Sequence, residues 1–398
     1  MNAEAEGRTL LVTVNGRDRP GLTAQLFDAL SEADIEVVDV EQVVVREHLT
    51  LAVLVTSSEH EGQVMSAVNR VGKELGLRVS CLSGHGDNKP RPRGRLAVTV
   101  LGNPLRPAAV AAVTRLIADH GANIDRVRRL SRYPVTTIEL DVSGSDAHAL
   151  RRTLVAEAGR RGVDVAVSPA GLARRGRRLV VLDVDSTLIT AEVIELLAEH
   201  ADRRAEVAAV TEAAMRGEID FAESLHQRVA VLKGLDVEVL ARVRDAVRLT
   251  DGADTLCRTL RQLGFTLGLV SGGFAEIVEP LAKRVDAQYV RANRLEVADG
   301  QLTGHVLGPV VDRAGKAAAL REFAAVENLP LARTVAIGDG ANDVDMLVAA
   351  GLGIAFNAKP VVREWADASV NVPYLDAVLY LLGISREEVE EADAMAAV

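Results

Sequence analysis

The 398-residue sequence has little of several residue types that define other classes of protein. Its two cysteines, Cys81 and Cys257, stand far apart, so the chain encodes neither a disulfide framework nor a cysteine-based zinc site. It lacks an excess of basic residues, because the formal net charge is −10. That balance argues against nucleic acid as the main partner, although a local basic patch does not show in a total.

Long apolar runs are also missing from the sequence. No stretch approaches the ~20 apolar residues that span a bilayer, and the N-terminal residues lack the basic and apolar regions of a secretory signal. Hydrophobic residues nevertheless make up 48% of the chain, enough for packed cores. We therefore expect a soluble, cytoplasmic protein with no membrane partner and, from its length, two or three domains.

The first half of the sequence contains an internal repeat. Residues 96–127 echo residues 10–40, since each stretch has a β-branched run, a turn with Gly and Pro, an amphipathic helix and a second strand. A further strand, helix and strand follow in both copies. Each copy therefore predicts the order β-α-β-β-α-β, an α+β fold with an antiparallel sheet and helices on one face.

Two stretches rich in Gly, Pro and charged residues predict linkers, at residues 83–95 and 169–178. The expected domains are therefore residues 1–90, 91–172 and 173–398.

The third domain shows a different pattern, in which short apolar strands alternate with helices. The strands are expected at residues 177–184, 264–271, 334–339 and 351–356. Nearly continuous apolar runs are typical of parallel strands that are buried on both faces. The pattern predicts an α/β fold with a doubly wound, Rossmann-like parallel sheet and ligands at the carboxyl ends of its strands. A mostly helical insertion at about residues 190–250 predicts a cap over that edge.

Polar residues follow three of these strands, in "DVDST" (183–187), "SGG" (271–273) and "GDGAND" (338–343). Oxygen ligands without a nearby His or Cys favour Mg²⁺ over zinc or copper. Asp183 and Asp185 are two residues apart, so in a strand they would share one face about 6.6 Å apart, unless the chain already turns there. The alternative is that these residues only cap helices and form turns.

Together these motifs resemble the haloacid dehalogenase superfamily of phosphotransferases, with Lys316 as a further motif residue. More closely, residues 179–390 resemble phosphoserine phosphatases. The two repeats resemble ACT domains, which are regulatory modules that bind amino acids, and the whole arrangement is similar to the long actinobacterial form of that family. The resemblance implies Mg²⁺-dependent hydrolysis of O-phospho-L-serine to L-serine and phosphate, the last step of L-serine biosynthesis.

The resemblance also implies roles for the carboxylates. Asp183 would attack phosphorus and form an aspartyl phosphate. Asp185 would protonate the departing hydroxyl and later deprotonate water, which requires a pKa above that of Asp183. Mg²⁺ would be held by Asp183, Asp339 and the backbone carbonyl of Asp185, with Asp343 in support.

The remaining motif residues suit contacts with the phosphate. Ser271, Gly272 and Lys316 can donate hydrogen bonds to its oxygens, and Gly273 and Asn342 complete the expected set. Lys316 by itself would more commonly be a solvated lysine at a helix start, but its place between the second and third strands favours the site.

Substrate selection is expected from the cap. Glu192, seven residues after Asp185, would receive the substrate ammonium, and Arg228 would receive its carboxylate in a bidentate contact. Met215 and Phe221 match the apolar residues that close over the substrate. The alternative is an ordinary amphipathic cap helix with solvated charges.

The first repeat carries the expected regulatory site. Asp18 is expected to cap a helix or meet an ammonium, and Gly21 to permit close backbone approach. The second repeat has Pro104 near the first of these positions and Ala108 at the second, so a ligand is expected mainly in the first. The family implies a homodimer with L-serine or another free amino acid as effector; the alternative is that the repeats only dimerise.

Three other functions remain open at this stage. One is a phosphatase of the same superfamily for another small phosphomonoester. Another is an amino-acid sensor with an inactive phosphatase-like domain, against which the complete motif set argues. The third is a receiver domain, which needs no long cap insertion.

Overall fold

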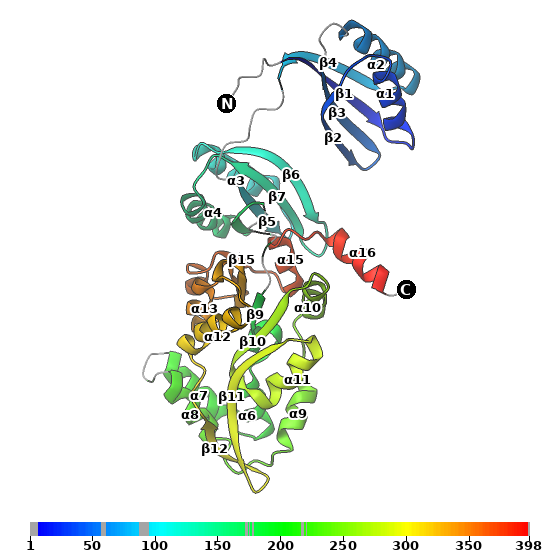
Figure 1. The fold of residues 1–398 in the computed structure, drawn as a ribbon. Coiled ribbons are helices and arrows are strands. Elements are labelled where there is room, and N and C mark those ends of the chain that lie inside the picture. The colour runs from blue at the N-terminus through cyan, green and yellow to red at the C-terminus, as the bar shows by residue number, and fades with distance from the viewer. Residues whose placement is uncertain are drawn as a thin grey trace. The chain divides into compact units, whose positions relative to one another are not determined.

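The computed structural model describes most of the chain, namely residues 7–56, 61–86, 95–171, 174, 176, 179–215, 219 and 221–396. The chain divides into two compact units, residues 1–91 and 92–398 (Figure 1). Among the helices of the described residues, none is both long and apolar enough to span a membrane.

The first unit has the predicted order of elements: β1 (Arg8–Arg17), α1 (Leu22–Leu30), β2 (Val37–Val45), β3 (His48–Thr56), α2 (Glu61–Leu75) and β4 (Arg78–His85). Its strands form an antiparallel sheet in the order β2-β3-β1-β4. Alternate residues of β1, Leu10, Val12 and Val14, pack with residues of α1 and α2 in one core. This confirms the predicted antiparallel sheet with a buried face under two helices.

The second unit begins with the second repeat: β5 (Leu96–Gly102), α3 (Pro107–Asp119), β6 (Asn123–Ser131), β7 (Thr136–Ser143), α4 (Ala147–Arg161) and β8 (Asp164–Pro169). Its strands pair antiparallel, as predicted, and lie in the order β8-β5-β7-β6. The repeat has a core of its own between the sheet and its two helices. The sequence did not predict that this sheet continues into the next domain, through the pairing of Ala166 in β8 with Ala368.

The predicted parallel sheet is present in the rest of the unit: β9 (Leu179–Asp183), β10 (Thr266–Phe274), β13 (Thr334–Gly338), β14 (Gly353–Phe356) and β15 (Ala368–Val370). A hairpin of β11 (Tyr289–Ala298) and β12 (Gln301–Leu307) extends one edge, and β8 continues the other, giving eleven strands in all. The helices between these strands are α10 (Ala253–Gln262), α11 (Ala275–Val285), α12 (Arg313–Val326) and α13 (Val344–Ala349). Every residue of β9, β13 and β14 is buried, as parallel strands between helical layers should be.

The insertion between β9 and β10 is helical, as predicted: α6 (Val193–His200), α7 (Arg204–Met215), α8 (Phe221–Ala230) and α9 (Val239–Ala246). Its two connections to the sheet lie side by side, because Ile189 pairs with Leu249. The cap therefore begins one turn after Asp183. The short helix α14 (Pro360–Arg363) lies between β14 and β15, and α15 (Val378–Leu381) and α16 (Arg386–Ala396) follow the last strand. Short 3₁₀ turns lie at Leu331–Arg333, Ala341–Asp343 and Leu375–Ala377.

Candidate active site

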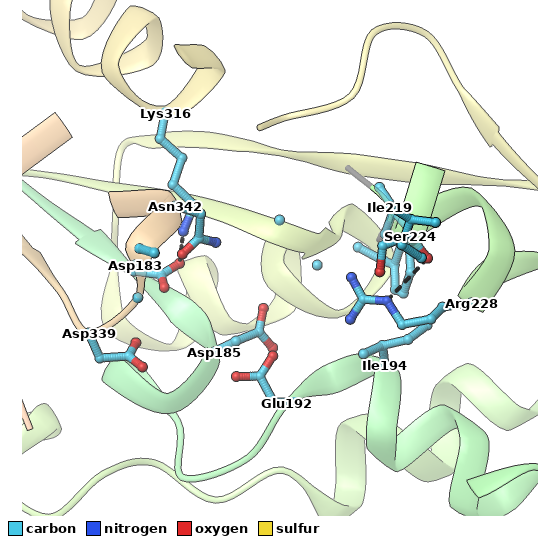
Figure 2. A pocket seen from close by; sticks show the side chains of 16 residues that line it. Asp183, Asp185, Glu192, Ile194, Ile219, Ser224, Arg228, Lys316, Asp339 and Asn342 are labelled. Carbon is cyan, nitrogen blue, oxygen red and sulfur yellow. Dashed lines mark hydrogen bonds and ion pairs between the residues drawn. The ribbon is translucent and has the colours of Figure 1, made fainter. Parts of the chain in front are cut away.

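Strand β9 stops at the first motif carboxylate, and the chain turns at once. Val184–Leu188 form a single wide helical turn in which Ser186 has a positive φ of 56°. Asp185 therefore belongs to a turn, and the two-residue spacing of an extended strand does not describe how it lies relative to Asp183. Both side chains nevertheless line one cavity of about 480 Å³ at the carboxyl end of the sheet (Figure 2).

No basic residue stands beside the motif carboxylates in the sequence, and the fold supplies one from a distant position, Lys316. Its Nζ donates to Asp183 Oδ1 and to Asp343 Oδ1, both at 2.7 Å, and the residue is 1% exposed. Burial lowers the pKa of Lys316, but the two carboxylates raise it more, so the ammonium stays charged. Helix α12 places it there because Asp312 caps the helix by accepting from the Gly315 N–H at 2.7 Å.

Three carboxylates form a cluster around this ammonium. Oxygens of Asp183, Asp339 and Asp343 lie within 4.8 Å of one another. Burial and then Asp343 raise the pKa of Asp183, and the same two causes raise the pKa of Asp339 to about 6. One ammonium does not balance three clustered carboxylates, two of them buried, so this hard-oxygen donor set fits a divalent cation such as Mg²⁺.

The carboxyl group of Asp185 lies outside that cluster and is held by hydrogen bonds. Its Oδ1 accepts from the Val193 N–H at 2.7 Å, where α6 begins, and its Oδ2 accepts from Ser271 Oγ at 2.9 Å. Burial raises the pKa of Asp185, and these two bonds oppose the rise. A Cβ at Gly273 would lie 2.8 Å from Asp185 Oδ2, so the close approach of this loop requires glycine.

Two cap residues bring opposite charges to the same cavity. Glu192 Oε1 accepts from Ser186 Oγ at 2.9 Å, and burial followed by repulsion from Asp185 raises the pKa of Glu192 to about 7. Burial lowers the pKa of Arg228, which Glu192 and Asp185 oppose. Figure 2 shows the Arg228 guanidinium pointing toward these two carboxyl groups. The Arg228 Nε–H donates to the Ser224 carbonyl at 3.3 Å, which orients the side chain.

The structure brings nearly all the predicted residues of this site together. Gly272, Gly273 and Asn342 also line the cavity. The side chains of Met215 and Phe221 lie outside the described part of the structure, although both residues are in helices. The described apolar lining includes Ile194, Ile219 and Leu225, among other residues.

Sequence analysis missed those apolar residues, since no spacing singles them out. The sequence indicated only a turn at Thr187 and gave no sign of a contact with the acidic cluster. Thr187 Oγ1 donates to Asp339 Oδ1 at 2.9 Å, and its carbonyl accepts from Thr250 Oγ1 at 2.7 Å. The threonine therefore orients one carboxylate of the acidic cluster.

The predicted regulatory residues lie at the start of helix α1, but not in the expected way. Gly21, not Asp18, is the N-cap residue, and no side chain caps the helix, so capping by Asp18 was wrong. Gly21 has a φ of 85°, and a Cβ there would find its nearest neighbour at 3.8 Å. The left-handed backbone therefore favours glycine at this position. The corresponding helix α3 starts with Arg106 in an extended conformation and Pro107 in its first turn, so Ala108 fits there.

Family models divide the chain in the same way, into two N-terminal repeats and a domain that carries the site. A model of haloacid dehalogenase-like hydrolases matches residues 180–348, and models of ACT domains match residues 8–81 and 96–168. The parallel sheet, the acidic cluster at its carboxyl edge and the buried lysine thus define a haloacid dehalogenase-like hydrolase with two N-terminal ACT domains.

Full-length relatives narrow the class. The chain is 57% identical to a phosphoserine phosphatase of Streptomyces coelicolor, over 98% of this chain and 95% of that protein. It is 50% identical to the phosphoserine phosphatase SerB2 of Mycobacterium tuberculosis, over 97% and 96%. A crystal structure of a probable phosphoserine phosphatase from Vibrio cholerae superimposes with a TM-score of 0.56 at 31% identity, covering 74% of this chain and 88% of that one. The chain belongs to the phosphoserine phosphatase family.

Proposed function

We propose that the protein hydrolyses O-phospho-L-serine to L-serine and inorganic phosphate, the last step of L-serine biosynthesis. The observation that carries the proposal is a single cavity with two chemically different ends. One end has Asp183 beside the Lys316 ammonium and suits a phosphate. The other has Glu192 and Arg228, a carboxylate and a guanidinium that match the ammonium and carboxylate of an amino acid.

In the first half of the reaction, the Asp183 carboxylate attacks phosphorus. The bond between phosphorus and the serine oxygen breaks, an aspartyl phosphate forms, and Asp185 gives its proton to the departing oxygen. The Lys316 ammonium, 2.7 Å from Asp183, reduces the repulsion between that carboxylate and the phosphate.

In the second half, Asp185 takes a proton from water, and the water oxygen attacks phosphorus. The bond from phosphorus to Asp183 breaks, phosphate leaves, and both side chains return to their starting states. Burial raises the pKa of Asp185 above its usual range, the direction that favours a role as general acid. Ser271, Gly272 and Lys316 donate to the phosphate oxygens, with Gly273 and Asn342 beside them.

Mg²⁺ is the proposed metal. Asp183, Asp339 and the backbone carbonyl of Asp185 would hold it, with Asp343 in support. When bound, Mg²⁺ supplies positive charge that offsets the repulsion between the carboxylates and the phosphate. EDTA is expected to abolish turnover and added Mg²⁺ to restore it; turnover that survives EDTA would contradict this assignment.

A substrate panel with two variants tests the proposed function. The protein should prefer O-phosphoserine over phosphothreonine, phosphohomoserine and a sugar phosphate.

Asp183→Asn should abolish all turnover, because it removes the nucleophile. Arg228→Ala should lower kcat/KM for phosphoserine about 100-fold, the cost of a lost charge-assisted pair, while it spares an aryl phosphate. Arg203→Ala is the matched control, since Arg203 lies in the cap but pairs with Glu206 at the exposed surface. Equal rates on all substrates would contradict phosphoserine specificity.

The ACT domains are expected to regulate this activity by binding an amino acid. We place them at residues 1–90 and 91–172, ahead of the phosphatase domain at 173–398, and the ranges matched by the family models support these boundaries. The proposed effector is L-serine, bound at the turn of Asp18 and Gly21 as feedback. Calorimetric titration with L-serine tests this, and unchanged heat on Gly21→Ala would contradict the site.

A homodimer is proposed through the first ACT domain. Its strand β2 lies at a sheet edge and exposes apolar side chains, among them Val43 at 52% and Val45 at 65%. Such an edge invites pairing with a second strand. Val43→Lys should shift the protein toward monomer in sedimentation velocity, and a wild-type protein that is already monomeric would contradict the proposal.

A further inference from the structure

Strand β10 leaves its regular pairing where it enters the active site. Val270 pairs with Arg291, and the next pair is Phe274 with Asn293, so three residues of β10 lie opposite one residue of β11. A bulge of this kind re-aims side chains and leaves backbone polar groups without ladder partners. The bulged residues are Ser271–Gly273, the loop that the proposed function places on the phosphate.

The side chain of Asn293 replaces part of the missing ladder. Its Nδ2 donates to the Gly272 carbonyl at 2.8 Å, and its Oδ1 accepts from the Val311 N–H at 2.8 Å. Asn293 is 2% exposed, so solvent water does not replace either hydrogen bond. The two bonds also settle which end of the amide faces the loop.

The bond to Gly272 acts on the peptide group that holds Ser271. The Gly272 carbonyl and the Gly273 N–H belong to one planar peptide group, so fixing the carbonyl also fixes the direction of the N–H. That N–H donates to Ser271 Oγ at 2.7 Å, and Ser271 Oγ donates to Asp185 Oδ2 at 2.9 Å. A chain of hydrogen bonds therefore connects Asn293 to Asp185 through one peptide group.

The second bond of Asn293 reaches the helix that carries the phosphate-binding lysine. Val311 directly precedes Asp312, the N-cap residue of α12, and Lys316 lies in the first turns of that helix. Asn293 thus joins the bulged loop on one side to the entry of α12 on the other. Ser271 and Lys316 come from different elements, and the buried Asn293 side chain fixes the position of these two elements relative to each other.

We propose that Asn293 is a positioning residue that holds the loop Ser271–Gly273 and the start of α12 in the arrangement that binds the phosphate. The inference rests on the proposed phosphatase function and deepens it. Asn293 touches no reacting atom, and it acts through the Gly272 peptide group and the Val311 N–H.

Two substitutions of Asn293 test its hydrogen bonds, one by removing the bond to Gly272 and the other by removing both bonds. Asn293→Asp keeps an acceptor for Val311 but sets a carboxylate oxygen against the Gly272 carbonyl, and Asn293→Leu removes both bonds at similar volume. For both variants, kcat/KM for phosphoserine should fall about 100-fold, as expected from a misplaced site. The inhibition constant of inorganic phosphate should rise about tenfold, the equivalent of one lost hydrogen bond. The ratio of phosphoserine to aryl phosphate turnover should stay unchanged, because the cap is intact.

Gln288→Leu is the matched control. Gln288 Oε1 accepts from the Leu267 N–H at 2.8 Å, so it makes a similar side-chain bond to the opposite end of β10. Its kcat/KM and phosphate inhibition should stay within about threefold of wild type. Hydrogen exchange of the peptide 270–276, followed by mass spectrometry, should speed up in the Asn293 variants and not in the control.

Each outcome decides the proposal. Folded Asn293 variants with wild-type kcat/KM, phosphate inhibition and loop exchange would overturn it. If both variants are unfolded even at 10 °C while Gln288→Leu is folded, Asn293 has a general structural role and the proposal is also wrong. If the wild-type protein does not hydrolyse phosphoserine, the proposed function fails, but phosphate binding and loop exchange still report on Asn293.

Discussion

The two ACT domains share one order of elements and differ in what surrounds their sheets. Strand β1 of the first alternates between buried and half-buried residues along its middle, whereas every residue of the equivalent β5 is buried. Near the end of β5, Leu101 belongs to the same hydrophobic core as Val180 and Leu182 of β9. The comparison teaches that a repeated sequence pattern specifies the local fold, while burial of the second face depends on the partner.

The junction between the second ACT domain and the phosphatase domain is made of more than one kind of contact. Among the residues that the structure describes, strand pairing across this junction consists of Ala166 with Ala368. Polar side chains add to it, since Arg174 bonds to Glu139, Asp164 bonds to Asn371, and Arg151 forms an ion pair with Asp367. If these contacts distinguish the second domain from the first, removing them should have larger effects than equivalent changes in the first domain.

The largest effect is expected from Arg174→Ala. Arg174 is 7% exposed, pairs with the buried Glu139, and donates to the Leu381 carbonyl at 2.9 Å. The variant removes one of the two guanidinium partners of the buried Glu139, which keeps Arg128, and also removes the bonds to the backbone carbonyls. The free energy of unfolding of the second unit should therefore fall by about 2–4 kcal/mol. Urea unfolding measures it.

Arg17→Ala in the first domain is the control for that change. Arg17 pairs with Glu47, but their side chains are 81% and 74% exposed. Such a pair contributes less than about 1 kcal/mol. Equal losses of unfolding free energy in the two variants would contradict the claim that the contacts of the second domain contribute more than those of the first.

A smaller effect with a characteristic pH dependence is expected at Asp164. Its carboxyl accepts from the Asn371 N–H at 2.7 Å and from the Asn371 side chain, yet burial raises its pKa above the usual range. A raised folded-state pKa means that the stabilising contribution is complete below the unfolded pKa of about 3.9 and is lost as the pH rises through the folded value. Asp164→Asn should remove this contribution and cost about 1–3 kcal/mol through the altered hydrogen bonds.

The measurement is the free energy of unfolding of both proteins between pH 4 and pH 8. The difference between wild type and Asp164→Asn should shrink as the pH rises through that range. A difference that is constant with pH would show that Asp164 does not titrate as its burial requires.

The smallest effects are expected from a reciprocal exchange at the starts of α1 and α3. Gly21→Ala places a Cβ on a left-handed backbone and should destabilise the first domain by about 1–2 kcal/mol. Ala108→Gly only loosens a helix start and should cost less than about 1 kcal/mol. Thermal unfolding followed by circular dichroism measures both, and a larger loss for Ala108→Gly would contradict the backbone difference between the domains.

Within the active site, sequence analysis predicted the members better than their geometry. The resemblance to a family singles out Glu192 by its spacing from Asp185 and Arg228 by its place in the cap, and both residues line the cavity. The position of Asp185 was not predictable from strand periodicity, because β9 ends before it and Ser186 turns the chain with a positive φ. Asn293 carried no signal at all, since its role comes from a bulge in the neighbouring strand.

The sequence by itself determined the order of the elements, the two repeats and the carboxylates at the strand ends, because hydrophobic periodicity and turn residues act over a few positions. Only the tertiary structure decided which strands from distant parts of the chain share a sheet. Strands β8 and β15 are about 200 residues apart, and a short apolar run does not specify its partner. Only the fold, likewise, brought Lys316 between Asp183 and Asp343, where the buried ammonium offsets part of the charge of the two buried carboxylates.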